Sequence, residues 1–198
     1  MNKRMGHVDS NSKKALRAFL DYFEIITVSI AIALVVFTFF FRLCYVDGNS
    51  MNNTLEDKQT LIISDTFYEP QTGDIIVFHP QNNNFKNPLV KRVIATGGQT
   101  VLIDVTEGTV SVDGIILNED YIYLKGGEYN IAYFNYNELD YDENGHLVFS
   151  KTVPEGYLFV MGDNRNGSTD SRSQSVGFVN EKAVLGKVIF RLKPFTFY

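Results

Sequence analysis

The sequence predicts a mostly β, antiparallel domain that follows one N-terminal transmembrane helix. Two observations carry this prediction. Residues 25–41 form an apolar segment without a charge, and after residue 45 short runs of Val, Ile, Phe and Tyr alternate with Gly, Asn and Asp. Short apolar runs with turn residues between them are typical of β sandwiches and barrels. The length of 198 residues suits one folded domain rather than two.

Composition excludes several classes of protein. The chain has 18 Lys or Arg against 23 Asp or Glu, a formal charge of −5, and 44% of its residues are hydrophobic. A disordered chain would be less apolar and more highly charged, and a nucleic-acid-binding domain would be basic. The single cysteine, Cys44, excludes an intrachain disulfide framework and a multi-cysteine metal site.

The apolar segment is interpreted as a membrane anchor over residues 20–43. With the apolar residues before it, the segment is long enough to cross a hydrocarbon core of roughly 30 Å as a helix, the only single-segment structure that satisfies its own backbone in lipid. Residues 1–20 contain five Lys or Arg and one Asp, whereas the other 178 residues contain 13 basic and 22 acidic side chains. The positive-inside rule therefore predicts a cytoplasmic basic tail over 1–19 and an extracytoplasmic domain over 44–198.

Two other interpretations of the segment are weaker. A cleaved signal peptide would be followed by a small-x-small site, but the sequence from residue 41 reads FRLCY. A buried core helix is seldom apolar all round and preceded by a basic tail. An uncleaved anchor fits both observations.

The domain after the anchor contains seven runs that we interpret as strands. They are residues 60–64, 74–78, 90–95, 100–105, 109–112, 156–160 and 183–192. Asp113-Gly114 lies between two apolar runs and predicts a tight hairpin turn. Residues 126–150 are rich in Tyr, Asn, Asp and Glu, which predicts a surface excursion or an edge hairpin.

Three polar clusters differ from ordinary strand-and-turn sequence. They are residues 47–55, residues 89–95 with Lys91 inside an apolar run, and residues 162–172, where two Arg and two Asp interleave. Taken singly, the first can be a turn, the second an edge strand protected from aggregation by its lysine, and the third a solvated loop or a structural ion-pair network. Their combination suggests catalysis.

A serine hydroxyl becomes a good nucleophile only when a base takes its proton, and Ser50 in the first cluster needs such a base. His7 lies in the predicted cytoplasmic tail, and His79 and His146 are in no recognisable triad context. Lysine can serve instead when burial lowers its pKa. Lys91 is the lysine with an apolar setting close to a polar cluster.

The clusters together resemble the type I signal peptidase family of Ser–Lys proteases, in its bacterial and smaller Gram-positive-like form. The motifs that carry the resemblance are SMNNTL over residues 50–55, GDIIVF over 73–78, KRVIA over 91–95 and GDNRNGSTDSR over 162–172. The resemblance covers about residues 20–190. It implies a signal-peptidase-like antiparallel β domain behind one membrane helix, in agreement with the reading of the strands.

The resemblance also implies roles for individual residues. Ser50 would be the nucleophile, with its backbone N–H as an oxyanion donor, Lys91 the general base, and Ser168 the residue that hydrogen-bonds and orients the lysine. The walls of a shallow pocket for small residues would be Val46, Met51, Leu55 and Val90. A bracing network would comprise Arg92, Asp163, Arg165, Asp170 and Arg172.

Four positions depart from the family pattern. Gly48 stands where some members have a serine as the second oxyanion donor, Asn53 replaces a proline, Ala95 a glycine and Gly167 an asparagine. The positions of the proposed nucleophile, base and supporting serine are intact.

The expected function is that of a single-pass, membrane-anchored serine endopeptidase that removes signal peptides from exported preproteins. Its expected partners are preproteins with small residues at the cleavage site and the lipid bilayer, and it needs no metal or cofactor. The alternatives are a signal-peptidase-like protein for one dedicated substrate and a non-catalytic factor in surface-fibre (pilus) assembly.

Overall fold

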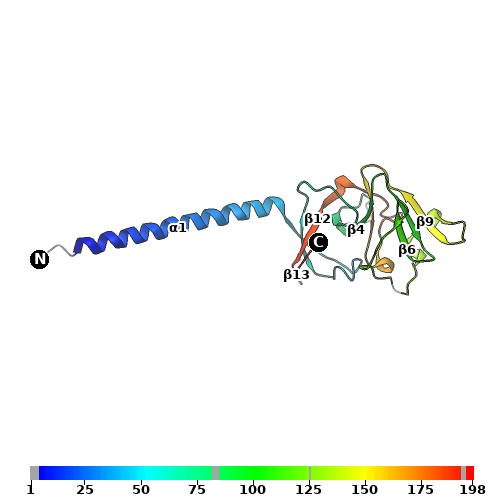
Figure 1. Ribbon diagram of the computed structural model, residues 1–198, viewed down its shortest axis with the longest axis horizontal. Coiled ribbons are helices and arrows are strands. Elements are labelled where there is room, and N and C mark those ends of the chain that lie inside the picture. The colour runs from blue at the N-terminus through cyan, green and yellow to red at the C-terminus, as the bar shows by residue number, and fades with distance from the viewer. Residues whose placement is uncertain (1–4, 82–84, 125, 193–194) are drawn as a thin grey trace. The chain divides into compact units, whose positions relative to one another are not determined.

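The computed structural model describes residues 5–81, 85–124, 126–192 and 195–198, and the chain divides into two compact units after Phe41. The first unit is helical and the second is built of strands (Figure 1). The division coincides with the end of the uncharged apolar run, since Arg42 is the first charged residue after it.

The first unit is one helix, α1, over Met5–Phe40. Its segment Ser12–Phe40 is long and apolar enough to cross a membrane, as the sequence predicts. The hydroxyl groups of Thr27, Ser29 and Thr38 donate to the backbone carbonyl four residues earlier, at 2.7–2.8 Å. These bonds satisfy hydroxyl groups that would otherwise lack a partner in hydrocarbon.

The helix and the predicted segments have different boundaries. Residues 5–19, expected as a basic tail, continue the helix, and Lys3 and Arg4 lie outside the described residues. At the other end, Arg42 and Leu43, expected within the anchor, begin strand β1, Arg42–Tyr45. The Arg42 guanidinium pairs with Asp65 at 3.0 Å, so a charge that is costly in lipid is satisfied within the β unit.

The larger of two sheets holds eight strands. Its order is β1, β2 (Thr60–Ser64), β12 (Val184–Leu192), β3 (Ile75–Phe78), β4 (Leu89–Thr96), β10 (Tyr157–Met161) and β11 (Val179–Asn180), and β13 (Phe195–Phe197) also pairs with β12. All of these pairs are antiparallel.

The smaller sheet holds five strands in the order β7 (Ile115–Ile116), β6 (Thr109–Val112), β5 (Thr100–Asp104), β9 (Leu147–Thr152) and β8 (Leu139–Tyr141). Its pairs are antiparallel too. Four single-turn 3₁₀ helices complete the described elements: Ile131–Tyr133, Tyr136–Glu138, Arg165–Gly167 and Glu181–Ala183. The predicted mostly β, antiparallel fold is confirmed.

All seven runs interpreted as strands form strands, with ends within one residue of the predicted ones. The Asp113-Gly114 turn is confirmed as well. It joins Val112 directly to Ile115, which pair in register, and both turn residues have positive φ, 52° and 81°. This is the conformation of a type I′ turn, whose twist matches that of the flanking strands.

Strand β4 lies between β3 and β10, in the middle of the larger sheet. Residues of β4 contribute to buried apolar clusters on both faces, with Ile94 in one and Val93 in another. The interpretation of Lys91 as a protective lysine on an edge strand is therefore wrong, since β4 is a central strand.

The stretch 126–150 combines an edge hairpin with core residues. Strand β8 is the edge of the smaller sheet and pairs with β9. The expectation of a surface excursion is wrong for three aromatic residues, because Tyr129, Phe134 and Phe149 are buried in one apolar cluster and pack edge to face at centroid distances of 5.6–5.8 Å. Such pairs add stability beyond the apolar area that they bury.

Candidate active site

Ser50 lies in an irregular segment between β1 and β2. The backbone N–H groups of Asn52 and Leu55 donate to the carbonyls of Asn49 and Met51, which folds the segment into two overlapping turns. Three apolar side chains of the segment, Val46, Met51 and Leu55, are buried in one cluster with residues of β2, β3 and β12. This packing fixes the segment to the larger sheet and leaves Ser50 half-buried.

Lys91 reaches Ser50 from strand β4. Its Nζ lies 2.8 Å from Ser50 Oγ and 2.9 Å from the backbone carbonyl oxygen of Val90. The two residues are 41 positions apart in the sequence, and the antiparallel sheet brings them together. Lys91 is only 3% exposed, so the predicted apolar environment of this lysine is present.

Burial lowers the pKa of Lys91 to about 8, because desolvation disfavours the charged ammonium. Asp170 and Asp163 act in the opposite direction, and Arg172 favours the neutral amine. Only a neutral amine can accept the proton of a serine hydroxyl. The lowered pKa makes that form available at mildly alkaline pH, which is the requirement for a general base.

Ser168 is completely buried near the same place, but its hydroxyl has no hydrogen-bond partner among the described residues. The hydrogen bond that we expected from Ser168 to Lys91 is therefore not formed in this arrangement. The role of Ser168 as an orienting residue remains a prediction.

The five residues expected to brace the site form buried ion pairs. Arg92 donates from Nε and Nη2 to the Asp163 carboxylate at 2.9 and 2.7 Å. Arg172 donates from Nε and Nη2 to Asp170, both at 2.8 Å. Complete burial alone would raise the pKa of Asp170, but the paired Arg172 lowers it, so this carboxylate stays ionised.

The partner of Arg165 was missed by sequence reasoning. Both Nη groups of Arg165 pair with the Glu119 carboxylate, and Nη1 also donates to the Tyr129 hydroxyl at 2.7 Å. Glu119 lies outside every motif that carries the family resemblance, so no local pattern marks it. The interleaved charges of residues 162–172 thus act as a structural ion-pair network whose partners come mostly from elsewhere in the chain.

The same polar segment also fixes the backbone beside the nucleophile. The backbone N–H of Asn164 donates to the carbonyl of Ser50, and its side-chain amide donates to the carbonyl of Asn49, both at 3.0 Å. Gly167, which departs from the family's asparagine, faces the side chain of Asn164 so closely that an added Cβ would lie 2.5 Å from Nδ2. Gly167 therefore leaves space for the Asn164 side chain, which bonds to the backbone next to Ser50.

Ser50 and Lys91 line a cavity of about 340 Å³ in the β unit. Three of the four predicted wall residues line it too: Val46, Met51 and Val90. The fourth, Leu55, does not, because it is fully buried in the apolar cluster of the Ser50 segment. Further wall residues that the sequence did not single out come from β1 and from the approach to β4, including Leu43, Cys44, Tyr45 and Pro88.

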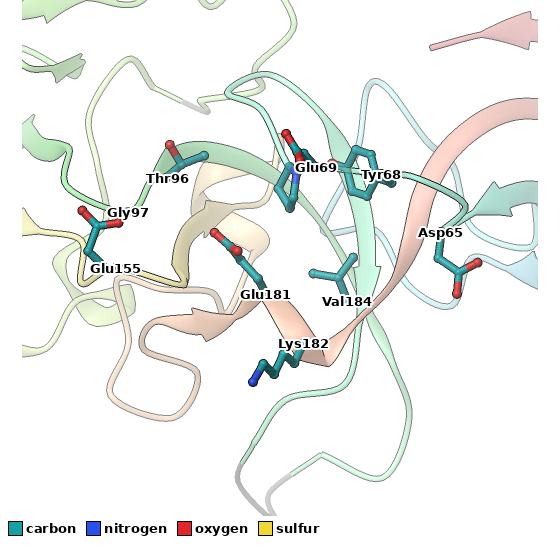
Figure 2. A pocket seen from close by; sticks show the side chains of 10 residues that line it. Asp65, Tyr68, Glu69, Thr96, Gly97, Glu155, Glu181, Lys182 and Val184 are labelled. Carbon is teal, nitrogen blue, oxygen red and sulfur yellow. The ribbon is translucent and has the colours of Figure 1, made fainter.

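A second cavity, of about 590 Å³, is lined by Tyr68, Thr96, Val184 and several carboxylates, among them Glu69, Glu155 and Glu181 (Figure 2). None of the predicted site residues lines it. Within the described ranges, no group of three or more His, Cys, Asp and Glu side chains is placed to hold a metal ion. The chemistry suggested by the sequence therefore belongs to the smaller cavity.

The histidines with described side chains lie elsewhere. His146 is in the turn before β9, where its Nδ1 is 2.8 Å from Asp104, and this carboxylate raises the pKa of the imidazole. His79 follows β3, with its backbone N–H bonded to the carbonyl of Ala183. Neither lines the cavity of Ser50, whereas Lys91 does.

Comparison with known proteins gives one family. A family model described as signal peptidase, peptidase S26, matches residues 19–193. A probable signal peptidase I-1 from Synechocystis sp. is 36% identical over 179 residues, which cover 86% of this chain and 80% of that protein. Signal peptidase I T from Bacillus subtilis is 28% identical, over 96% of this chain and 93% of that protein. A crystal structure of a signal peptidase I from Enterococcus faecalis V583 is 32% identical, covers 61% of this chain and 97% of its own, and has a TM-score of 0.45.

The family model spans nearly the whole described β unit and the second half of α1. It includes the segment of Ser50, strand β4 with Lys91 and the buried ion pairs of residues 162–172. The chain therefore belongs to the signal peptidase family, peptidase S26.

Proposed function

We propose that this chain is a membrane-anchored endopeptidase that removes signal peptides from exported preproteins with Ser50 as the nucleophile and Lys91 as the general base. The observation that carries the proposal is the 2.8 Å contact between Lys91 Nζ and Ser50 Oγ in the wall of a cavity. Family membership supports the substrate class. A non-catalytic role in fibre assembly is not favoured, because Ser50 is in contact with a lysine whose pKa is lowered, which supports catalysis.

Lys91 carries a proton twice in the reaction, first the proton of Ser50 and then one from water. Neutral Lys91 takes the first proton as Oγ attacks the scissile carbonyl, and the backbone N–H of Ser50 donates to the oxyanion that forms. The resulting ammonium gives the proton to the leaving amine, which breaks the peptide bond and leaves an acyl ester on Ser50. Water then attacks this ester while Lys91 takes one of its protons, and the ammonium passes that proton to the departing Ser50 Oγ, so that the carboxylic acid is released and Ser50 and neutral Lys91 are restored.

The cavity walls support a preference for small residues next to the scissile bond. Val46, Met51 and Val90 offer apolar surface beside Ser50, which accepts alanine more readily than charged side chains. The anchor adds a second selection, since a preprotein whose signal sequence lies in the same bilayer is held close to the site at high effective concentration. The charge bias along the chain supports a cytoplasmic N-terminus and an extracytoplasmic active site.

A cleavage assay tests the proposal. Wild-type protein in liposomes is expected to cut a preprotein with an Ala-x-Ala site, and Ser50→Ala is expected to lower the rate by about 10³-fold or more, because the acyl ester can no longer form. Ser111→Ala, on strand β6 outside the cavity, is the matched control and should cleave like the wild type. A folded wild type that leaves this preprotein intact would favour a dedicated substrate or a binding role.

The rate of cleavage is expected to rise with pH. Because the base must be neutral and burial lowers its pKa to about 8, kcat/KM should be low under acidic conditions, rise through an inflection near 8 and level off above it. Initial rates between about pH 6 and 10 give the profile. An inflection near the ordinary histidine pKa of about 6.5 would speak against the lysine base.

A further inference from the structure

Thr54 connects the segment of the nucleophile to two other parts of the β unit. Its backbone carbonyl oxygen accepts two side-chain hydrogen bonds, from Arg191 Nη1 at 2.8 Å and from the Tyr198 hydroxyl at 3.1 Å. Its hydroxyl donates to Asp163 Oδ2 at 2.5 Å. Thr54, four positions after Ser50, is thus held by hydrogen bonds at its side-chain hydroxyl and at its backbone carbonyl.

Asp163 extends this connection to the base. Its carboxylate accepts both hydrogen bonds of Arg92 described above, and Arg92 directly follows Lys91 on β4. The Arg92 guanidinium also lies 3.9 Å over the ring of Tyr121, which fixes its position further. Thr54 therefore gives the segment of Ser50 a second connection to strand β4, through Asp163 and Arg92, beside the direct contact of Ser50 with Lys91.

The two donors to the Thr54 carbonyl come from the last strands of the β unit. Arg191 lies on β12, where it is paired in register with Leu61 of β2. Tyr198 follows β13, donates its backbone N–H to the carbonyl of Ile189, and packs against the apolar cluster that contains Met51. The Arg191 guanidinium lies 5.9 Å from the centre of the Tyr198 ring, so both donors are anchored on β12 and on each other.

We infer that Arg191 and Tyr198 are positioning residues for cleavage, which act by holding the Thr54 carbonyl and through it the Ser50–Lys91 contact. The inference rests on the proposed function. Neither side chain lines the cavity, so neither acts on the substrate directly. The segment around Ser50 belongs to no regular element, so hydrogen bonds from other parts of the unit add to its apolar packing in holding it in place. A hydrogen bond from a charged donor, such as Arg191 on the central strand β12, is stronger than one between neutral groups. A displacement of a reacting group by about 1 Å can lower a rate by about 10²-fold.

The test compares Arg191→Met, Tyr198→Phe and the double variant in the full-length protein in liposomes. Each single variant keeps one donor, so we expect kcat to fall about 10-fold and about 3-fold respectively, with KM unchanged within about twofold. The double variant leaves the carbonyl without either donor, and we expect its loss to exceed the product of the single losses, at about 100-fold. Unfolding temperatures are measured on the same samples.

Two further variants separate positioning from general stability. Lys187→Met removes another cation from β12, one that pairs with Asp74 at 2.6 Å rather than with Thr54, and kcat should be unchanged. Arg191→Lys restores a charged donor on the same strand, and we expect it to recover most of the kcat lost in Arg191→Met. A role in stability alone would lower the rate only in proportion to the fraction of unfolded enzyme, so kcat per folded molecule would stay at the wild-type value in every variant.

The inference is overturned if the folded double variant cleaves within about twofold of the wild type, or if its loss disappears when the assay is run well below its unfolding temperature. The proposed function fails by a different result. In that case the wild type does not cleave, or Ser50→Ala cleaves as the wild type does, whatever the variants of Arg191 and Tyr198 do.

Discussion

Lys91→Met is expected to lower kcat/KM for preprotein cleavage by about 10³-fold or more while the fold is retained. The substitution keeps an unbranched apolar side chain of similar length and removes the amine that lies 2.8 Å from Ser50 Oγ. Without a base, the hydroxyl keeps its proton and is a poor nucleophile. The measurements are steady-state cleavage in liposomes and thermal unfolding of the same preparations.

The thermal stability of Lys91→Met provides an independent test of the lowered pKa. In the folded protein the pKa of Lys91 is lowered from 10.5 to about 8, so below pH 8 the folded state contains a charged group that it disfavours. The resulting destabilisation applies in full below pH 8 and is relieved as the pH rises toward 10.5, because the unfolded chain then binds more protons than the folded one. Lys91→Met is therefore expected to unfold at the same or a higher temperature than the wild type at neutral pH.

Lys91→Arg is the matched control for charge. Arginine keeps a cation at this position but stays protonated at all accessible pH values, so it too should be inactive. Cleavage by Lys91→Met within about tenfold of the wild-type rate would remove lysine from the mechanism. The base would then have to be sought among the histidines, although His79 and His146 lie outside the cavity.

The strands were predictable because their signals are local. The run at 60–64 is a short apolar stretch of the kind that forms strands, and it forms the strand Thr60–Ser64. Asp113-Gly114 marks the turn between β6 and β7 by residue type alone. The order of the strands had no such signal. Strand β12 lies between β2 and β3 although it follows them by about a hundred residues, and side-chain packing across the whole unit decides that place.

The aromatic residues of 126–150 show where composition misleads. Tyr, Asn and acidic residues indicate a solvated segment, and most side chains of the segment are exposed or half-buried. Tyr129, Phe134 and Phe149 nevertheless complete the core between the two sheets, where Phe149 also packs against Phe159 of β10. A few buried aromatics at irregular spacing carry no periodic pattern that could mark them.

The site was predictable to a similar degree. Ser50 and Lys91 were candidates because no histidine stood in a triad context and the lysine lay in an apolar run, and the family resemblance then implied their roles. The structure places their side chains in contact. The residues that hold them were less visible. Glu119, Arg191 and Tyr198 contact these parts of the chain through one or two long-range hydrogen bonds each, and no spacing in the sequence points to such pairs.

Gly162→Ala is expected to lower kcat by about 10²-fold through a displacement of Ser50 or Ser168. The backbone at Gly162 is outside the left-handed region, so space rather than φ requires a glycine here. An added Cβ would lie 2.5 Å from Ser168 Cβ and 2.5 Å from the carbonyl oxygen of Ser50. That carbonyl is held by the N–H of Asn164, so the backbone of the nucleophile or the polar segment must move, at a cost of about 1–3 kcal/mol in stability.

Gly145→Ala separates this effect from destabilisation. Gly145 has φ of +79° and no atom within 4 Å of an added Cβ, so alanine there costs about 1–2 kcal/mol of backbone strain without touching the site. Urea unfolding should then show similar losses of stability for the two variants, while kcat falls only for Gly162→Ala. Equal kcat values would mean that the close packing of Gly162 against Ser50 and Ser168 does not set the geometry of the reaction. A difference of about a hundredfold would show that this packing holds the nucleophile in place.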